Sequence, residues 1–202
     1  MSEKCQKFFQ DILKTIHTMK IFDNFSFLAF ILISVISFSL NAQNIFDFGN
    51  DLNLKNWYIV NDDVMGGFSS STLTIDNSGH GIFSGEISLD NNGGFASIRH
   101  NFKKISVSKN NTINILLKGD KKIYQLRIKE NNYDYHSYVY NFTTSGKWEI
   151  ISINLDDMYP SFRGRKLNDQ NFSGDHINQI SILIANKVEE NFSLLIDKLY
   201  LK

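Results

Sequence analysis

The chain has 202 residues, of which 42% are hydrophobic, and this is enough for a single domain with a sizeable core. Lys and Arg together number 21, as do Asp and Glu, so the net charge is zero, which argues against a general nucleic-acid binder. Cys5 is the one cysteine, so no disulfide can form within the chain.

An uncharged, mostly apolar run extends from Phe25 to Leu40. It is shorter than the roughly twenty residues that a membrane-spanning helix needs, and it suits the apolar part of a secretory signal peptide. Leu40-Asn41-Ala42 is a candidate cleavage site, so we expect 1–42 to be an N-terminal extension with a signal peptide and 43–202 to be the domain. The expected location is therefore the periplasm or cell envelope, with 25–40 acting as a membrane anchor if the signal is not cleaved. Met19 is a second candidate start beside Met1.

From Asn44 onward the hydrophobic pattern has a period of two, which is typical of strands. Strands are expected at 45–48, 57–60, 82–89, 96–102, 112–118, 123–129, 133–142, 148–155, 177–185 and 192–201. Within 123–129, Tyr124, Leu126 and Ile128 are expected to face inward, and Gln125, Arg127 and Lys129 outward. The stretch Asp156–Asp175 has no obvious strand and is interpreted as a functional or flexible loop.

These short strands alternate with turn signals rich in Asn, Asp and Gly. Strands that recur every 8–12 residues or so with such turns are typical of an all-β sandwich or barrel. We therefore predict one antiparallel β-sandwich, without linkers or internal repeats.

Two stretches stand out within this pattern. Trp57 to Gly67 begins as an aromatic, β-branched strand and ends in a turn that carries two adjacent carboxylates and two glycines. Asn91 to Arg99 again places a pair of glycines before an aromatic strand start, and it supplies an arginine.

The motifs in these stretches and downstream resemble the complex I intermediate-associated protein 30 family. The matching residues are Asp62 to Gly67 followed by Ser69, Phe83-Ser84-Gly85, Asn92 to Arg99, Gly119-Asp120 with Tyr124, Phe142-Thr143-Thr144 with Trp148, and Arg163-Gly164-Arg165. They are spread in order over nearly the whole domain.

The resemblance implies a galactose-binding-like jelly roll, related to carbohydrate-binding modules. Mitochondrial members of the family are assembly factors for respiratory complex I, and the family brings no catalytic residue or cofactor to this chain. We therefore expect a non-enzymatic assembly or adaptor module whose partner is a protein complex, including one associated with a membrane. The alternative is an exported carbohydrate-binding module whose partner is a glycan.

Asp62 and Asp63 allow three interpretations: a general acid/base pair, calcium ligands, or an internal salt bridge or turn network that includes Arg99. Adjacent residues of a strand point to opposite faces, which disfavours the acid/base pair. We favour the internal network, in which the fork of Arg99 would bind a carboxylate in bidentate geometry.

Two further groups are candidate binding sites. Arg163 and Arg165 would present guanidinium groups to a partner's carboxylates or to a sugar, or else fix their loop to the domain. Tyrosines form an alternating ladder in 133–142, with Tyr133 and Tyr135 on one face and Tyr138 and Tyr140 on the other. One face is expected to be core, and the exposed face, through Tyr135 or Tyr138, is a candidate platform for stacking sugar rings.

No catalytic or metal site is expected. The five histidines are scattered, no cysteine stands near them, and no Gly-x-Ser-x-Gly motif is present.

Overall fold

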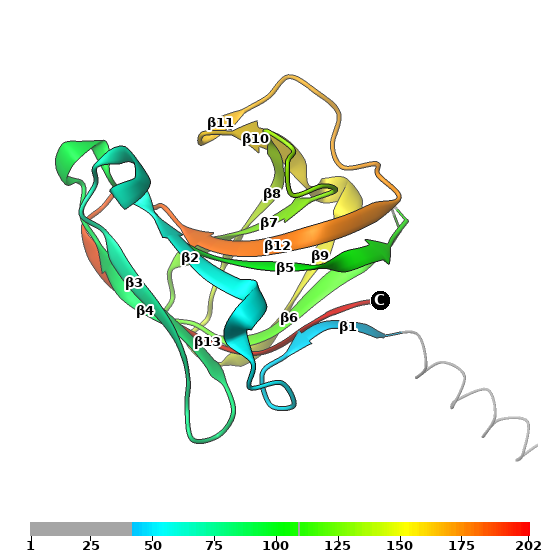
Figure 1. The fold of residues 1–202 in the computed structure, drawn as a ribbon, viewed down its shortest axis with the longest axis horizontal. Coiled ribbons are helices and arrows are strands. Elements are labelled where there is room, and N and C mark those ends of the chain that lie inside the picture. Colours follow the sequence, from blue (N-terminus) through cyan, green and yellow to red (C-terminus); the bar gives the residue numbers. More distant parts are fainter. Residues whose placement is uncertain (1–41, 109) are drawn as a thin grey trace, which may run out of the picture. The chain divides into compact units, whose positions relative to one another are not determined.

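The computed structural model describes residues 42–108 and 110–202, in which Gln43–Lys202 form one compact unit (Figure 1). The apolar run 25–40 and both candidate start residues lie outside the described residues. Across the two described ranges, no helix has the length and apolar character needed to cross a membrane.

Two antiparallel sheets form the fold. The six-stranded sheet contains β1 (Gln43–Asp47), β3 (Ser70–Ile75), β4 (Gly81–Ile87), β6 (Thr112–Lys118), β9 (Trp148–Asn154) and β13 (Glu190–Leu201). The seven-stranded sheet contains, in spatial order, β11 (Arg165–Lys166), β10 (Tyr159–Phe162), β8 (Ser137–Thr143), β7 (Ile123–Lys129), β12 (His176–Ile184), β5 (Ala96–Ser106) and β2 (Trp57–Asn61). Short 3₁₀ turns connect some of them: η2 (Leu54–Asn56), η3 (Asp62–Met65), η4 (Asp90–Asn92) and η5 (Leu155–Asp157). The predicted all-β sandwich is confirmed.

The core lies between the two sheets and follows the alternation of the sequence. Tyr124, Leu126 and Ile128 of β7 are buried, as are Ile113, Ile115 and Leu117 of β6. Tyr124 packs edge-on against Phe192 of β13, which joins the two sheets, with ring centroids 6.4 Å apart. Each such burial contributes about 1.5–3 kcal/mol. The alternate side chains of β7, Gln125, Arg127 and Lys129, face outward and are left to form a surface.

Most expected strands form, and the exceptions have physical reasons. The segments 112–118 and 123–129 are strands with the expected bounds. The strand expected at 133–142 begins only at Ser137, because Tyr133 and Tyr135 belong to the preceding loop. The stretch Asp156–Asp175 was wrongly read as lacking strands, since it holds β10 and β11. Strand β3, rich in Ser and Thr, was also missed.

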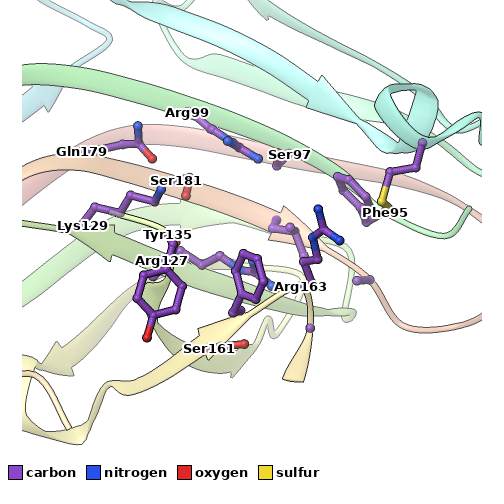
Figure 2. Close-up of a pocket in the computed structure, with 16 residues that line it drawn as sticks. Phe95, Ser97, Arg99, Arg127, Lys129, Tyr135, Ser161, Arg163, Gln179 and Ser181 are labelled. Atoms are coloured by element: carbon purple, nitrogen blue, oxygen red, sulfur yellow. The ribbon is translucent and has the colours of Figure 1, made fainter. Parts of the chain in front are cut away.

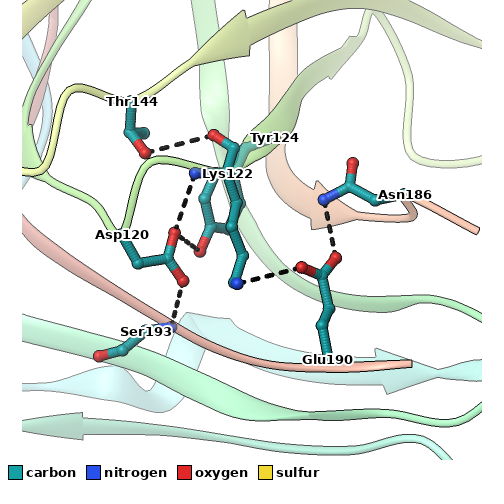
Figure 3. A network of polar contacts seen from close by, with 7 residues as sticks. All are labelled: Asp120, Lys122, Tyr124, Thr144, Asn186, Glu190 and Ser193. Carbon is teal, nitrogen blue, oxygen red and sulfur yellow. Dashed lines mark hydrogen bonds and ion pairs between the residues drawn. The ribbon is translucent and has the colours of Figure 1, made fainter. Parts of the chain in front are cut away.

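A polar network ties the two sheets together at one end (Figure 3). The Asp120 carboxylate accepts hydrogen bonds from the Tyr124 hydroxyl of β7 at 3.0 Å and from the Ser193 amide of β13 at 2.9 Å. Nearby, Lys122 forms an ion pair with Glu190 of β13 at 3.2 Å. Burial raises the pKa of Tyr124 above its ordinary value, and the Asp120 carboxylate adds to this effect. The tyrosine therefore acts as a neutral donor.

Candidate binding groove

A groove of about 330 Å³ lies on the outer face of the seven-stranded sheet. Figure 2 shows side chains from β5, β7 and β12 directed toward it, with Phe95 and Arg163 at its sides. Side chains alternate along these strands, so that one half of them faces the core and the other half faces the groove.

Strand register arranges the floor of the groove as rows. Ser181 of β12 pairs with Arg99 of β5 on one side and with Arg127 of β7 on the other. In the next row, Gln179 stands between Asn101 and Lys129. Side chains that are distant in the sequence are thus fixed beside each other by backbone pairing.

The cationic side chains of the floor are half-buried, and neutral acceptors orient two of them, Arg127 and Lys129. The Arg127 guanidinium donates to Gln125 Oε1 from Nε at 3.0 Å and from Nη2 at 2.6 Å. Lys129 Nζ donates to the Asp134 carbonyl oxygen at 2.6 Å. Burial, together with the nearby Arg99 charge, lowers the pKa of Arg127 to about 10 and also lowers the pKa of Lys129. Arg127 therefore remains protonated at neutral pH.

Neutral polar groups, together with Leu183, complete the floor. Ser97, Ser137, Ser161 and Ser181 contribute hydroxyls. The Gln179 amide donates to the Tyr58 hydroxyl and to Asn101 Oδ1, both at 2.9 Å, so its orientation is fixed. Hydroxyl and amide groups of this kind can exchange hydrogen bonds with a polar ligand.

Aromatic side chains stand at one side of the groove. Tyr135 is 66% exposed and Phe162 39% exposed, and their ring centroids lie 5.5 Å apart in an edge-on arrangement. The Arg163 guanidinium lies over the Phe162 ring, 5.3 Å from its centroid. This side of the groove therefore combines exposed aromatic surface with a positive charge.

Asp62 is fully buried and serves the fold. Its carboxylate accepts hydrogen bonds from the amides of Ser69 at 2.9 Å, Gly94 at 2.6 Å and Phe95 at 3.1 Å, and from the Ser69 hydroxyl. Burial alone would raise the pKa of Asp62, but these hydrogen bonds outweigh it and hold the pKa below its usual value. A Cβ added to Gly93 would lie 2.7 Å from Asp62 Oδ2, so this carboxylate also requires a glycine beside it.

The interpretation of Asp62 as part of a turn network is thereby confirmed, but its expected pairing with Arg99 is wrong. No ion pair between described residues involves Arg99, which lines the groove instead. The structure thus gives Asp62 the internal role that the sequence analysis favoured. Asp63 is exposed and is not part of the groove lining.

The other predicted site residues divide between the groove and its surroundings. Tyr135 and Arg163 line the groove together with Arg99. Tyr138 does not, because it is turned toward the core, where it packs edge-on against Phe172 at 5.1 Å. Arg165 is exposed on β11, outside the groove. Of the two sets of tyrosines expected in 133–142, the exposed one is therefore Tyr133 and Tyr135.

Sequence reasoning placed Arg127 and Lys129 outward correctly but did not recognise them as part of a site. It also missed Ser181 and Gln179. The signal was present as polar residues at alternate positions of an otherwise apolar strand. In the described ranges, no set of three or more His, Cys, Asp or Glu side chains is arranged to hold a metal ion.

Comparison with known proteins gives three results. The model of a family described as complex I intermediate-associated protein 30 matches residues 46–196. A search of curated proteins finds no match to the chain. Several solved structures do match.

Two of these structures are family 11 carbohydrate-binding modules from Clostridium thermocellum. The module of a cellulosomal cellulase is 20% identical, with a TM-score of 0.59, over 80% of this chain and 94% of that chain. A module in complex with a β-1,3-1,4-mixed-linked tetrasaccharide is 20% identical, with a TM-score of 0.56, over 79% of this chain and 94% of that chain. At this identity the likeness establishes a shared fold.

Proposed function

The chain belongs to the complex I intermediate-associated protein 30 family, and from that premise we propose that it is a non-enzymatic binding module that holds a carbohydrate chain in the groove. The observation that carries the proposal is the groove itself, with exposed aromatic rings beside a floor of hydroxyl, amide and cationic groups. Carbohydrate-binding modules with the same fold lend support, and one of them is described in complex with a tetrasaccharide.

Binding rather than catalysis is supported by the chemistry of the lining. The described residues that line the groove include no Asp, Glu, His or Cys side chain. General acid/base catalysis of glycoside cleavage ordinarily uses a pair of carboxyl groups on either side of the bond. We therefore propose that the ligand leaves the groove unchanged.

Family membership favours a second candidate, in which the same surface binds a protein of a larger complex. The description of the family refers to intermediates of complex I, and Arg99 and Arg163 would suit the carboxylates of a protein partner. For either ligand we propose that the protein works outside the cytoplasm, because the apolar run 25–40 has the character of an export signal. N-terminal sequencing of the purified protein tests this, with Gln43 as the expected first residue.

The test of the carbohydrate proposal is a binding assay by calorimetry, in which the purified protein is titrated with a panel of soluble oligosaccharides. At least one is expected to bind. Tyr135→Ala and Phe162→Ala should each weaken binding roughly tenfold, which corresponds to about 1.4 kcal/mol, because they remove the aromatic surface of the groove.

Tyr133→Ala is the matched control. Tyr133 belongs to the same loop and is 98% exposed, but it does not line the groove, so its loss should leave affinity unchanged. Binding that is equally insensitive to Tyr135→Ala and Phe162→Ala would show that the glycan sits elsewhere. If no glycan binds, and the same two substitutions release the protein from a membrane complex, the adaptor function stands instead.

A further inference from the structure

The groove concentrates positive charge, although the chain as a whole has no net charge. Lys and Arg balance Asp and Glu at 21 each over the whole sequence, yet the described lining contains Arg99, Arg127, Lys129 and Arg163 and no carboxylate. A neutral ligand would not require this segregation, since hydroxyl and amide groups alone can bind neutral sugars.

Within 42–108 and 110–202, these charges also have no ion-pair partner. Ion pairs between described residues join Asp76 to His80, Lys122 to Glu190 and Asp175 to His176, and none involves a cation of the groove. The acceptors that hold Arg127 and Lys129 are an amide oxygen and a backbone carbonyl, which fix position without neutralising charge. The Asp134 carboxylate attracts Lys129, but its Oδ2 is already bonded to the Asn131 amide at 2.8 Å.

Like charges held close together in a partly buried site carry a cost. Burial is the main cause of the lowered pKa of Arg127, and the neighbouring Arg99 charge, across β12, adds to it. Such a cost is offset when an anion enters the site, because a charge-assisted hydrogen bond is roughly twice as strong as a neutral one. The groove is therefore organised for a ligand that brings negative charge with it.

We propose that the groove binds an anionic polysaccharide, a chain of sugar rings carrying carboxylate or sulfate groups, through Arg99, Arg127 and Lys129. This inference rests on the proposed carbohydrate-binding function and specifies its ligand class. Arg99 and Arg127 stand two strands apart, about 10 Å, and Lys129 lies roughly 7 Å along β7 from Arg127, so the cations can reach successive charged groups of an extended chain.

The aromatic side favours a polysaccharide over an acidic peptide. Tyr135 and Phe162 offer exposed ring surface to the apolar faces of sugar rings, while Ser137 and Ser181 line the groove with hydroxyls that can bond the ring substituents. An acidic peptide would bind the cations, but it does not in general require aromatic rings and hydroxyl groups as well.

The experiment compares charged and neutral glycans on the same protein. Oligogalacturonate and a sulfated galactan oligosaccharide are the two anionic ligands, neutral galactan and mixed-linkage glucan oligosaccharides are the neutral ones, and poly-glutamate is the peptide competitor. At low ionic strength we expect an anionic glycan to bind at least tenfold more tightly than either neutral one. Added NaCl should weaken this binding, because dissolved ions screen the attraction between the charged groups of the ligand and the cations of the groove. The relative affinity of the two anionic ligands identifies carboxylate or sulfate as the preferred group.

Three variants test the residues. Arg127→Gln and Arg99→Gln should each reduce affinity for the anionic glycan at least tenfold, whereas Arg127→Lys, which keeps the charge, should recover part of the loss. Lys118→Gln is the matched control, because it removes the same charge from an exposed position of β6 in the other sheet. Circular dichroism of each variant verifies that it is folded.

The outcomes separate this inference from the proposed function. Neutral glycans that bind as tightly as anionic ones, with no effect of Arg99→Gln or Arg127→Gln, would overturn the inference and leave the carbohydrate-binding function standing. Failure of every glycan would overturn both. Poly-glutamate that displaces the anionic glycan at equal charge concentration would overturn the choice of a polysaccharide.

Discussion

Asp62 is a single buried carboxylate that holds three parts of the chain together. It lies in η3, and it accepts hydrogen bonds from Ser69, just before β3, and from Gly94 and Phe95, just before β5. A buried charge is tolerated when several donors surround it, and three backbone amides do so here. Of the two adjacent acids Asp62 and Asp63, the first therefore has a structural role.

We expect Asp62→Asn to lower the free energy of unfolding by about 1–3 kcal/mol, because the new amide group places its own donors against backbone amides. Urea denaturation at neutral pH measures the loss. The matched control is Asp63→Asn, next in the chain and exposed, which should change stability by less than about 0.5 kcal/mol. Equal losses in the two variants would contradict the anchoring role.

The difference between wild type and Asp62→Asn should also depend on pH. The folded-state pKa of Asp62 is lowered, so the ionised carboxylate contributes stability above the unfolded-state pKa of about 3.9, and this contribution is lost as pH falls through the lower folded-state value. Unfolding free energies of the two proteins should therefore converge in acid. A difference that stays constant down to pH 2 would argue against this origin.

At the scale of elements, Asp120 connects strands of opposite sheets. It follows β6, and its carboxylate receives the Tyr124 hydroxyl of β7 and the Ser193 amide of β13. The Tyr124 side chain is fully buried, so its hydroxyl depends on this acceptor.

A double-mutant cycle measures this connection. Tyr124→Phe should cost about 1 kcal/mol of unfolding free energy, and Asp120→Ala about 1–3 kcal/mol because it leaves buried donors without an acceptor. The double variant should cost less than the sum by roughly 0.5 kcal/mol or more, since both changes remove the same hydrogen bond. Asp156→Ala, at an exposed position, serves as the control. Strict additivity would mean that the hydrogen bond contributes nothing.

Strand prediction succeeded where local signals agree and failed where they conflict. The segment 123–129 alternates cleanly between turns and was predicted with its bounds. Tyr133 to His136 also alternates, yet it forms a loop, because short-range pattern does not reveal where pairing between strands begins. Strand β10 was missed. It contains Pro160, a residue that is uncommon in inner strands, and it pairs with its two neighbours through short ladders only.

The groove was only partly predictable for a related reason. Arg99, Tyr135 and Arg163 were singled out separately, each from its local motif. Their meeting depends on the pairing of β5 with β12 and of β12 with β7, between segments far apart in the sequence. Periodicity shows which side a residue faces, but it does not show which strand lies next to it.

At the scale of the whole molecule, a neutral chain carries a strongly uneven distribution of charge. Cations gather in the groove, and no described residue forms an ion pair with them. Without ligand, their repulsion opposes folding, and dissolved salt reduces it.

We therefore expect the double variant Arg99→Gln/Arg127→Gln to be more stable than wild type at low salt, by on the order of 1 kcal/mol. Urea midpoints measured across a series of NaCl concentrations should show this difference shrinking as salt rises. Lys118→Gln, which removes a charge outside the groove, should show no comparable dependence. A double variant less stable than wild type at every salt concentration would show that the arginines support the fold itself.

The rows of the groove floor also have a consequence for engineering. Residues 97, 99 and 101, residues 179, 181 and 183, and residues 125, 127 and 129 occupy matched positions on three neighbouring strands, like cells of a grid. The core is built from the alternate residues, such as Ile98, Leu126 and Ile182. The groove lining and the core thus come from opposite faces of the same strands. A library randomised at the half-buried grid positions 99, 125, 127 and 129, with the buried positions 97, 179, 181 and 183 kept, should retain its scaffold, which makes this face suitable for selecting binders to new ligands.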